Sequence, residues 1–118
     1  MTTIEREIRV ELPSDVVTKV LYEYRFQVPP GKVQRVTDLL VLDKPSQDFE
    51  IALEKNDVRR GAIYASTAYF ANAREPTQGA FNHCRIENAD SAYFVVTRLN
   101  PTIKTLISAK VHLTIDES

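Results

Sequence analysis

The chain has 118 residues, of which 43% are hydrophobic and 26% charged, so its composition is that of one globular domain and not of a disordered segment. Its 15 basic and 16 acidic residues leave a formal charge of -1. This balance argues against a protein whose main task is to neutralise phosphates. We therefore expect a single domain without a nucleic-acid partner.

The N-terminal residues, MTTIEREIRVEL, alternate charged and apolar side chains where a signal peptide needs an unbroken apolar block. No apolar run approaches the roughly 20 residues that cross a bilayer, so we predict a soluble protein with no signal peptide, no transmembrane segment and no membrane partner. Ile4 and Ile8 have helical spacing, whereas Ile8, Val10 and Leu12 have strand spacing. Pro13 leaves too little room for a long helix, which favours a strand or an extended arm over residues 1–12.

Alternating apolar and polar side chains predict strands along most of the remaining chain. Residues 19–28 read KVLYEYRFQV and residues 105–115 end in ISAKVHLTI, and each segment has one apolar face. Further strands are predicted in shorter or weaker patterns, at residues 33–42, 49–54, 61–67, 68–73, 81–87 and 91–99. The best helical candidate, residues 14–21, merges into the next strand pattern, so we expect at most a turn there.

Turn-forming residues separate these strands every ~8–15 residues, which is typical of an all-β sandwich or barrel. The hardest stop is Pro29-Pro30-Gly31, because proline cannot continue a ladder and glycine allows a sharp reversal. The cluster Leu39–Leu42 then breaks the alternation, which predicts a bulge or a strand covered on both faces. We predict an all-β fold, a two-sheet antiparallel sandwich of jelly-roll-like form over residues 13–118. Local periodicity does not separate a jelly roll from an immunoglobulin-like strand order.

Residues able to carry catalysis or bind metal are few and dispersed. Cys84 is the lone cysteine, so no disulfide can form within the chain, and we expect it to be a small buried apolar group. His83 and His112 lack metal-ligand spacing, although a pairing of the two in space remains an alternative. We predict no catalytic residues, no cofactor and no metal. The protein is therefore expected not to be an enzyme, with a small β-fold enzyme as the minor alternative.

Two charged groups allow weaker alternatives. Asp43, Asp48 and Glu50 flank a loop and offer oxygen ligands for calcium, without the regular ligand spacing of a calcium loop. The basic pair Arg59-Arg60 could contact a phosphate, but its acidic neighbours predict a solvated turn.

From Tyr24 to Val41 the sequence YRFQVPPGKVQRVTDLLV has an aromatic-rich strand, a Val-Pro-Pro-Gly-Lys turn and an apolar strand. This segment resembles small jelly-roll domains of tailed-phage and related virion proteins, among them head decoration (cement) proteins and fibre or spike domains. Residues 49–53, 87–95 and 107–115 resemble later strands of those domains, although Asn88-Ala89-Asp90 stands where they often have a glycine. The likeness runs from about residue 22 to residue 115.

The resemblance implies a virion structural protein, either a capsid decoration (cement) protein or a minor capsid protein, that stabilises the shell by subunit–subunit contacts. It implies a homo-oligomer, with a trimer favoured, and a major capsid protein or other virion subunit as partner. The location would be the virion, after assembly in the host cytoplasm. The N-terminal stretch would add to a neighbour's sheet edge. Its candidate interface residues are Ile4, Ile8, Val10 and Leu12.

The alternative function is a carbohydrate- or receptor-binding module of a phage fibre or spike. Such a module would expose aromatic and polar side chains in one loop, and the candidates are Tyr69, Asn72, Arg74, Gln78 and Asn82. The tyrosines could form a stacking platform for sugars or bases. Tyr22 and Tyr24, however, lie on the apolar face of their predicted strand, which favours packing in the core.

Overall fold

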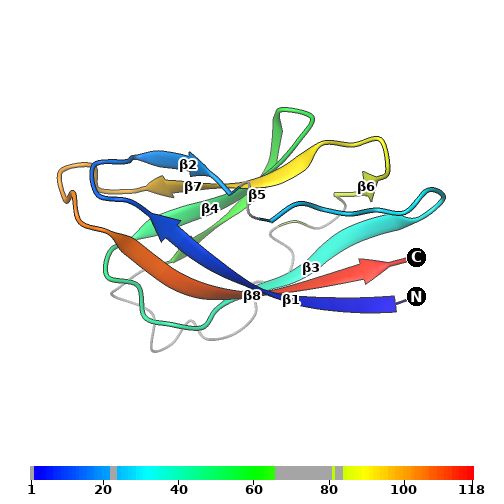
Figure 1. Ribbon diagram of the computed structural model, residues 1–118, viewed down its shortest axis with the longest axis horizontal. Coiled ribbons are helices and arrows are strands. Elements are labelled where there is room, and N and C mark those ends of the chain that lie inside the picture. Colours follow the sequence, from blue (N-terminus) through cyan, green and yellow to red (C-terminus); the bar gives the residue numbers. More distant parts are fainter. Residues whose placement is uncertain (1, 22–23, 66–80, 82–83) are drawn as a thin grey trace.

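The protein is an all-β sandwich of two antiparallel sheets in one domain, as the sequence predicted (Figure 1). The computed structural model describes residues 2–21, 24–65, 81 and 84–118. Its strands are β1 (Thr2–Leu12), β2 (Thr18–Val20), β3 (Val33–Val41), β4 (Phe49–Lys55), β5 (Val58–Ala65), β6 (Ile86–Glu87), β7 (Ala92–Arg98) and β8 (Ile107–Glu117). Sheet A has the order β1-β8-β3-β6, and sheet B has the order β2-β7-β4-β5.

The strand pairing is nested. β1 pairs with β8, β2 with β7, β3 with β6 and β4 with β5. The chain therefore resembles one long hairpin that turns between β4 and β5, with each early strand paired to a late one. This hairpin folds over on itself, so that β8 also pairs with β3 and β7 also pairs with β4. An immunoglobulin-like sandwich instead pairs its first strand with its second. The observed order therefore differs from that alternative.

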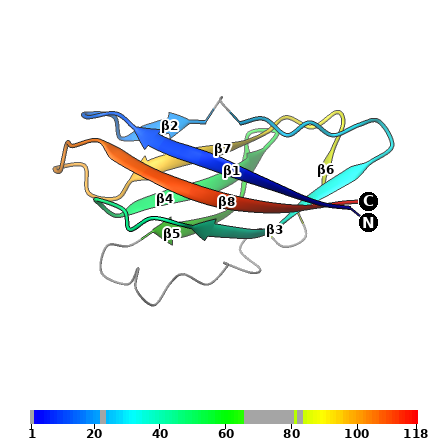
Figure 2. The same ribbon diagram turned by 60° about the horizontal axis from the view of Figure 1, so that its bottom comes forward.

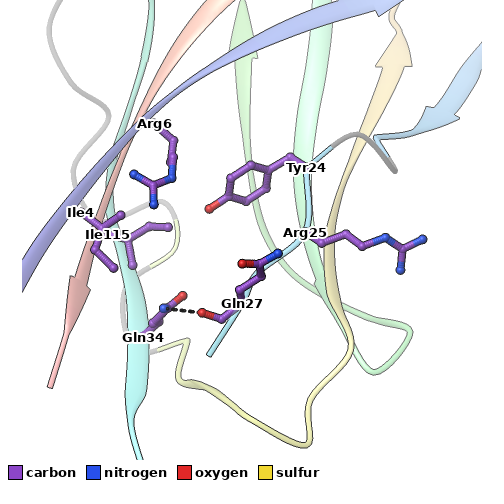
Figure 3. Close-up of a pocket in the computed structure, with 7 residues that line it drawn as sticks. All are labelled: Ile4, Arg6, Tyr24, Arg25, Gln27, Gln34 and Ile115. Atoms are coloured by element: carbon purple, nitrogen blue, oxygen red, sulfur yellow. Dashed lines mark hydrogen bonds between the residues drawn. The ribbon is translucent and has the colours of Figure 1, made fainter. Parts of the chain in front are cut away.

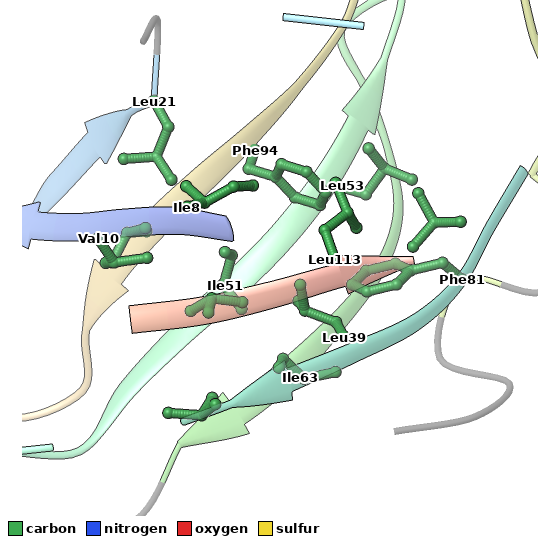
Figure 4. Close-up of a cluster of buried hydrophobic side chains, with 14 of the residues drawn as sticks. Ile8, Val10, Leu21, Leu39, Ile51, Leu53, Ile63, Phe81, Phe94 and Leu113 are labelled. Carbon is green, nitrogen blue, oxygen red and sulfur yellow. The ribbon is translucent and has the colours of Figure 1, made fainter. Parts of the chain in front are cut away.

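Side chains from the inner faces of both sheets form one apolar core (Figure 4). β8 buries every second residue from Ile107 to Ile115, as its alternation predicted. Phe94 of β7 is fully buried, and its ring centre lies 5.5 Å from Phe26, 6.0 Å from Tyr24 and 6.2 Å from Phe81. Complete burial of such a side chain stabilises the fold by about 1.5–3 kcal/mol. The four rings therefore form one aromatic cluster within and against the core.

The strand predicted over residues 19–28 forms at its start, and the prediction is wrong for Leu21 and residues 24–28. β2 ends at Val20, and the Leu21 amide still donates to the Phe94 carbonyl at 2.9 Å. Residues 24–28 then leave the sheet, although Tyr24 and Phe26 pack against the core and Val28 is buried. The alternation indicates an extended chain covered on one face, and this does not require a neighbouring strand.

Two other predicted strands differ in extent. Of the strand predicted at residues 81–87, Ile86–Glu87 form β6, whereas Phe81, Cys84 and Arg85 lie in no strand. β5 begins at Val58 instead of residue 61. The strand predicted at residues 68–73 lies outside the described residues. A register shift lies between Val36 and Asp38, not within Leu39–Leu42. There Thr37 is the extra residue, and its hydroxyl donates to the Thr114 carbonyl at 3.2 Å.

The stop at Pro29-Pro30-Gly31 is a tight turn into β3, as predicted. The Lys32 amide donates to the Pro29 carbonyl at 3.1 Å, and Gly31 has a φ of 79°. Proline at the second position and a positive φ at the third define a type II turn, which glycine adopts without strain. This turn reverses the chain from the extended segment at 24–28 into the centre of sheet A.

Candidate functional site

β1 is an edge strand, and only one of its two sides is paired with another described strand. It pairs with β8 along its whole length, from Thr2 opposite Glu117 to Leu12 opposite Ile107. Its other side is the end of sheet A and borders none of the described strands (Figure 2). Of the candidate interface residues, Ile8, Val10 and Leu12 are buried in the protein's own core, and Ile4 is half-buried. A partner at this edge would therefore meet backbone groups and charged side chains.

The outward-facing charges of β1 are held loosely. Arg9 Nε lies 2.9 Å from Glu11 Oε1, and Arg9 Nη2 donates to Ser108 Oγ at 3.2 Å. His112 Nε2 lies 3.5 Å from Glu5 Oε1. The carboxylates and the guanidinium are more than half exposed, so each pair contributes little to stability. These charges can regroup around a partner at small cost.

A polar groove of about 390 Å³ lies between β1 and the extended segment that follows β2 (Figure 3). The Arg6 guanidinium and the Tyr24 hydroxyl face the groove from opposite sides, and Ile4 and Ile115 lie beside it. Burial raises the pKa of the Tyr24 phenol, and the charge of Arg6 opposes that effect. Gln34 is 3% exposed, and its Nε2 donates to the Gln27 carbonyl at 3.0 Å and to Glu117 Oε2 at 2.9 Å.

A second groove, of about 310 Å³, lies on the other side of Tyr24 and follows the same strand edge. Its lining combines Ile8 with the charged residues Glu7, Arg9, Glu11 and Lys19. Lys19 Nζ donates to the Glu11 carbonyl at 3.4 Å. Both grooves are within the size range of small-ligand sites. The outer edge of β1 therefore has backbone groups that pair with no described strand, and both grooves lie next to it.

The other tyrosines do not form a stacking platform within the described residues. Tyr24 packs against the core, as predicted. Tyr64 and Tyr93 lie on sheet B opposite different residues of β4, Glu50 and Glu54 respectively. The Tyr93 hydroxyl donates to Asp57 Oδ1 at 2.8 Å, and this hydrogen bond is the main cause that raises the pKa of Tyr93 to about 12. Tyr22 and Tyr69 lie outside the described residues.

The charged groups singled out in the sequence are separated by the fold. Asp43 Oδ2 accepts from the Lys110 amide at 3.3 Å, whereas Glu50 on β4 pairs with Arg59 at 2.8 Å. The calcium alternative therefore loses Glu50 as a ligand near Asp43. No group of three histidine, cysteine or acidic side chains suited to a metal ion occurs among residues 2–21, 24–65, 81 and 84–118.

The remaining candidates divide between described and undescribed parts of the chain. Cys84 is buried, as predicted, and burial raises the pKa of its thiol. His112 is on the outer face of sheet A, while His83 lies outside the described residues, so their pairing stays an untested alternative. The candidate ligand loop also lies outside them, at Tyr69, Asn72, Arg74, Gln78 and Asn82. Within the described segments, we find no helix with the length and apolar character needed to cross a membrane.

Sequence reasoning missed a buried polar cluster around Arg98, which is 3% exposed. Its guanidinium donates to four carbonyl oxygens and one amide oxygen: Pro13 (3.1 Å), Val16 (3.1 Å), Ile103 (2.7 Å), Thr105 (2.7 Å) and Gln47 Oε1 (2.8 Å). The signal was present in β7, because Phe94, Val96 and Arg98 share the inward-facing parity. The cluster joins the connections β1–β2, β3–β4 and β7–β8.

The sequence matches no known family model, and no curated protein matches it significantly.

Proposed function

We propose that this protein is a structural subunit of a virus particle, a capsid decoration or minor capsid protein that stabilises the shell through subunit contacts. The observation that carries the proposal is the strand order. The described residues form eight strands in two sheets, and their nested pairs β1–β8, β2–β7, β3–β6 and β4–β5 support a jelly-roll assignment. Jelly rolls are the fold of many viral capsid domains, and also of lectins and cupins.

Two further observations support a structural role over the other uses of that fold. A cupin has its reactive site inside the barrel, whereas here the space between the sheets is filled by apolar side chains. The long edge of β1 offers backbone groups to another chain, which is how strand addition joins subunits. Many such contacts, each modest, add up over a symmetric shell. The resemblance of residues 22–115 to virion domains points the same way.

The test begins with the genes that flank this one, where we expect a major capsid protein or a portal protein. The neighbouring capsid protein is then co-expressed with this chain, and the particles are separated on a sucrose gradient. We expect this chain to sediment with the particles in a fixed ratio to the capsid protein. Capsids that form normally but leave it at the top of the gradient would contradict the proposal.

A second candidate, a carbohydrate- or receptor-binding module, is supported by the groove beside Tyr24. Lectins also use the jelly-roll fold, and small-ligand sites combine apolar walls with a few placed polar groups. Arg6, Tyr24 and Gln27 supply such groups next to Ile4 and Ile115. A glycan array separates the two functions: a specific binder whose signal is lost in Tyr24→Ala favours recognition, and an empty array favours the structural role.

A further inference from the structure

The free side of β1 presents a regular row of backbone donors and acceptors. The Glu5 carbonyl accepts from Arg6 Nη1 at 2.9 Å, and the Glu11 carbonyl accepts from Lys19 Nζ at 3.4 Å, so both carbonyls point away from β8. Backbone groups alternate in direction along a strand, so the N–H and C=O groups of Glu7 and Arg9 point the same way. Among the described residues, no backbone group forms a hydrogen bond with this row.

β1 is also the longest and most regular edge in the described part of the sandwich. The opposite edge of sheet A is β6, of two residues, and one edge of sheet B is β2, of three. The remaining edge, β5, has eight residues but contains a register shift against β4 at Leu53/Glu54. Short or irregular edges resist pairing. An eleven-residue strand that pairs with β8 without a shift is a suitable template for another strand.

The charge pattern of β1 is complementary to itself. If two copies of β1 lie antiparallel with residues 2–12 fully overlapped, Glu7 faces Glu7 and Glu5 faces Arg9 of the second copy. By symmetry, Arg9 then faces Glu5 of the second copy. Moving either strand by one pairing step in one direction sets Glu5 against Glu11, and in the other direction sets Glu5 against Glu7. Full overlap therefore gives the longest ladder with the fewest like-charge pairs.

The Arg9 side chain has a donor available for this exchange. Arg9 uses Nε for Glu11 and Nη2 for Ser108, and its Nη1 contacts no acceptor among the described residues. Arg6 and Lys19 each cover one edge carbonyl with a long flexible side chain. A second β1 strand would replace these two side-chain donors with backbone amides.

We propose that two copies of this chain join edge to edge through antiparallel β1 strands, so that two four-stranded A sheets form one continuous sheet. The contact has two-fold symmetry and closes at two copies. It differs from the trimer that the resemblance implies, and it rests on the fold and charge pattern of β1 and not on the virion assignment. The central Glu7 pair is the one like-charge contact, and it weakens the dimer.

Sedimentation of the full chain over a range of concentrations tests the proposal. We expect a reversible dimer in the unchanged protein. Glu5→Arg and Arg9→Glu should each raise the dimer dissociation constant at least about tenfold, because two attractive pairs become repulsive. An equal mixture of these two variants should regain the dimer, since every arginine then faces a glutamate. Glu7→Gln should lower the dissociation constant, because it removes the central repulsion.

A charge reversal away from the edge is the matched control. Lys104 is an exposed lysine of the β7–β8 connection, and Lys104→Glu should leave dimerisation unchanged. The backbone is tested by proline. Glu7→Pro removes an edge donor and leaves the β1–β8 ladder intact, whereas Arg6→Pro removes a ladder donor. We expect Glu7→Pro to be a folded monomer and Arg6→Pro to lose stability.

A strict monomer, a trimer, or a dimer that is insensitive to Glu5→Arg and Arg9→Glu would overturn the proposal. So would a mixture of the two variants that stays monomeric. A deletion of residues 1–11 would not isolate the edge contact, because it would also remove Ile8 and Val10 from the core. The co-sedimentation experiment with capsids measures a different property. A monomer that sediments with the particles would refute only the dimer. A dimer that does not sediment with the particles would refute only the virion role.

Discussion

Arg98 is a cation placed among neutral oxygens, and it holds together the connections β1–β2, β3–β4 and β7–β8. Arg98→Met keeps much of the length but removes all donors, leaving buried carbonyl groups without partners. We expect a loss of about 3 kcal/mol or more in the free energy of unfolding, measured with urea. Lys104→Met, at an exposed lysine of the same β7–β8 loop, is the control and should change stability by less than about 0.5 kcal/mol. Equal stabilities for the two variants would contradict the role of Arg98.

Tyr93 supplies a pH-dependent contribution to stability. Its pKa in the folded protein is about 12, above the ordinary value of 10.0, because the hydroxyl donates to Asp57. A raised folded pKa means that the contribution is fully present below pH 10 and is lost as pH rises through about 12. In an NMR titration of labelled tyrosine, Asp57→Asn should move this pKa down towards 10, with Tyr93→Phe identifying the signal. A pKa that stays near 12 in Asp57→Asn would show that Asp57 is not the cause.

At the scale of elements, the β4–β5 hairpin depends on two residues with positive φ, Asn56 (52°) and Asp57 (65°). Two such residues form the type I′ turn, which matches the twist of paired strands. Asn56 also ties the hairpin to the turn before β7, since its Nδ2 donates to Asp90 and its Oδ1 accepts from the Ser91 amide, each at 2.9 Å. The bond from Asn56 is the main cause that lowers the pKa of Asp90.

Two substitutions at Asn56 separate these contributions. Asn56→Gly keeps the backbone conformation and loses the side-chain bonds, so we expect it to cost about 1–2 kcal/mol in unfolding free energy. Asn56→Ala loses the same bonds and must also hold a left-handed φ, which adds about 1 kcal/mol. Urea unfolding of both variants measures the difference. If the alanine variant were as stable as the glycine variant, backbone strain would not limit this turn.

The limits of sequence reasoning also differ between elements. Alternation located β8 and β3 well, because strands with one covered face and regular pairing follow the period of two. It extended β2 too far, since Tyr24 and Phe26 turn one face to the core without a strand beside them. In β4, Glu50 and Ala52 point to the outer face of sheet B and are nevertheless buried. Alternation does not predict this burial, because it depends on the neighbouring strands β5 and β7 on either side of β4.

At the scale of the whole molecule, the two-layer fold could be predicted but the strand order could not. Turn spacing and alternation describe each strand alone, whereas the nested pairing depends on contacts between the two ends of the chain. The candidate site shows the same division. The apolar residues of β1 were identified, but two tertiary contacts decide their role. Packing between the sheets places Ile8 and Val10 in the core, and pairing with β8 leaves the opposite edge of β1 facing outward. The grooves beside Tyr24 likewise arise only once β1 lies next to the segment that follows β2.

Because β1 leaves the ribosome before the other strands of the sandwich and β8 leaves after them, the two halves of this pair meet only once β8 has been synthesised. β8 also lies between β1 and β3, so these two strands cannot join one sheet until Ile107–Glu117 has emerged. Long-range pairing of this kind is slow and leaves apolar strands exposed meanwhile. During translation, the apolar side chains of Ile8, Val10 and Leu12 therefore stay exposed to water until β8 has emerged and sheet A can close over the core.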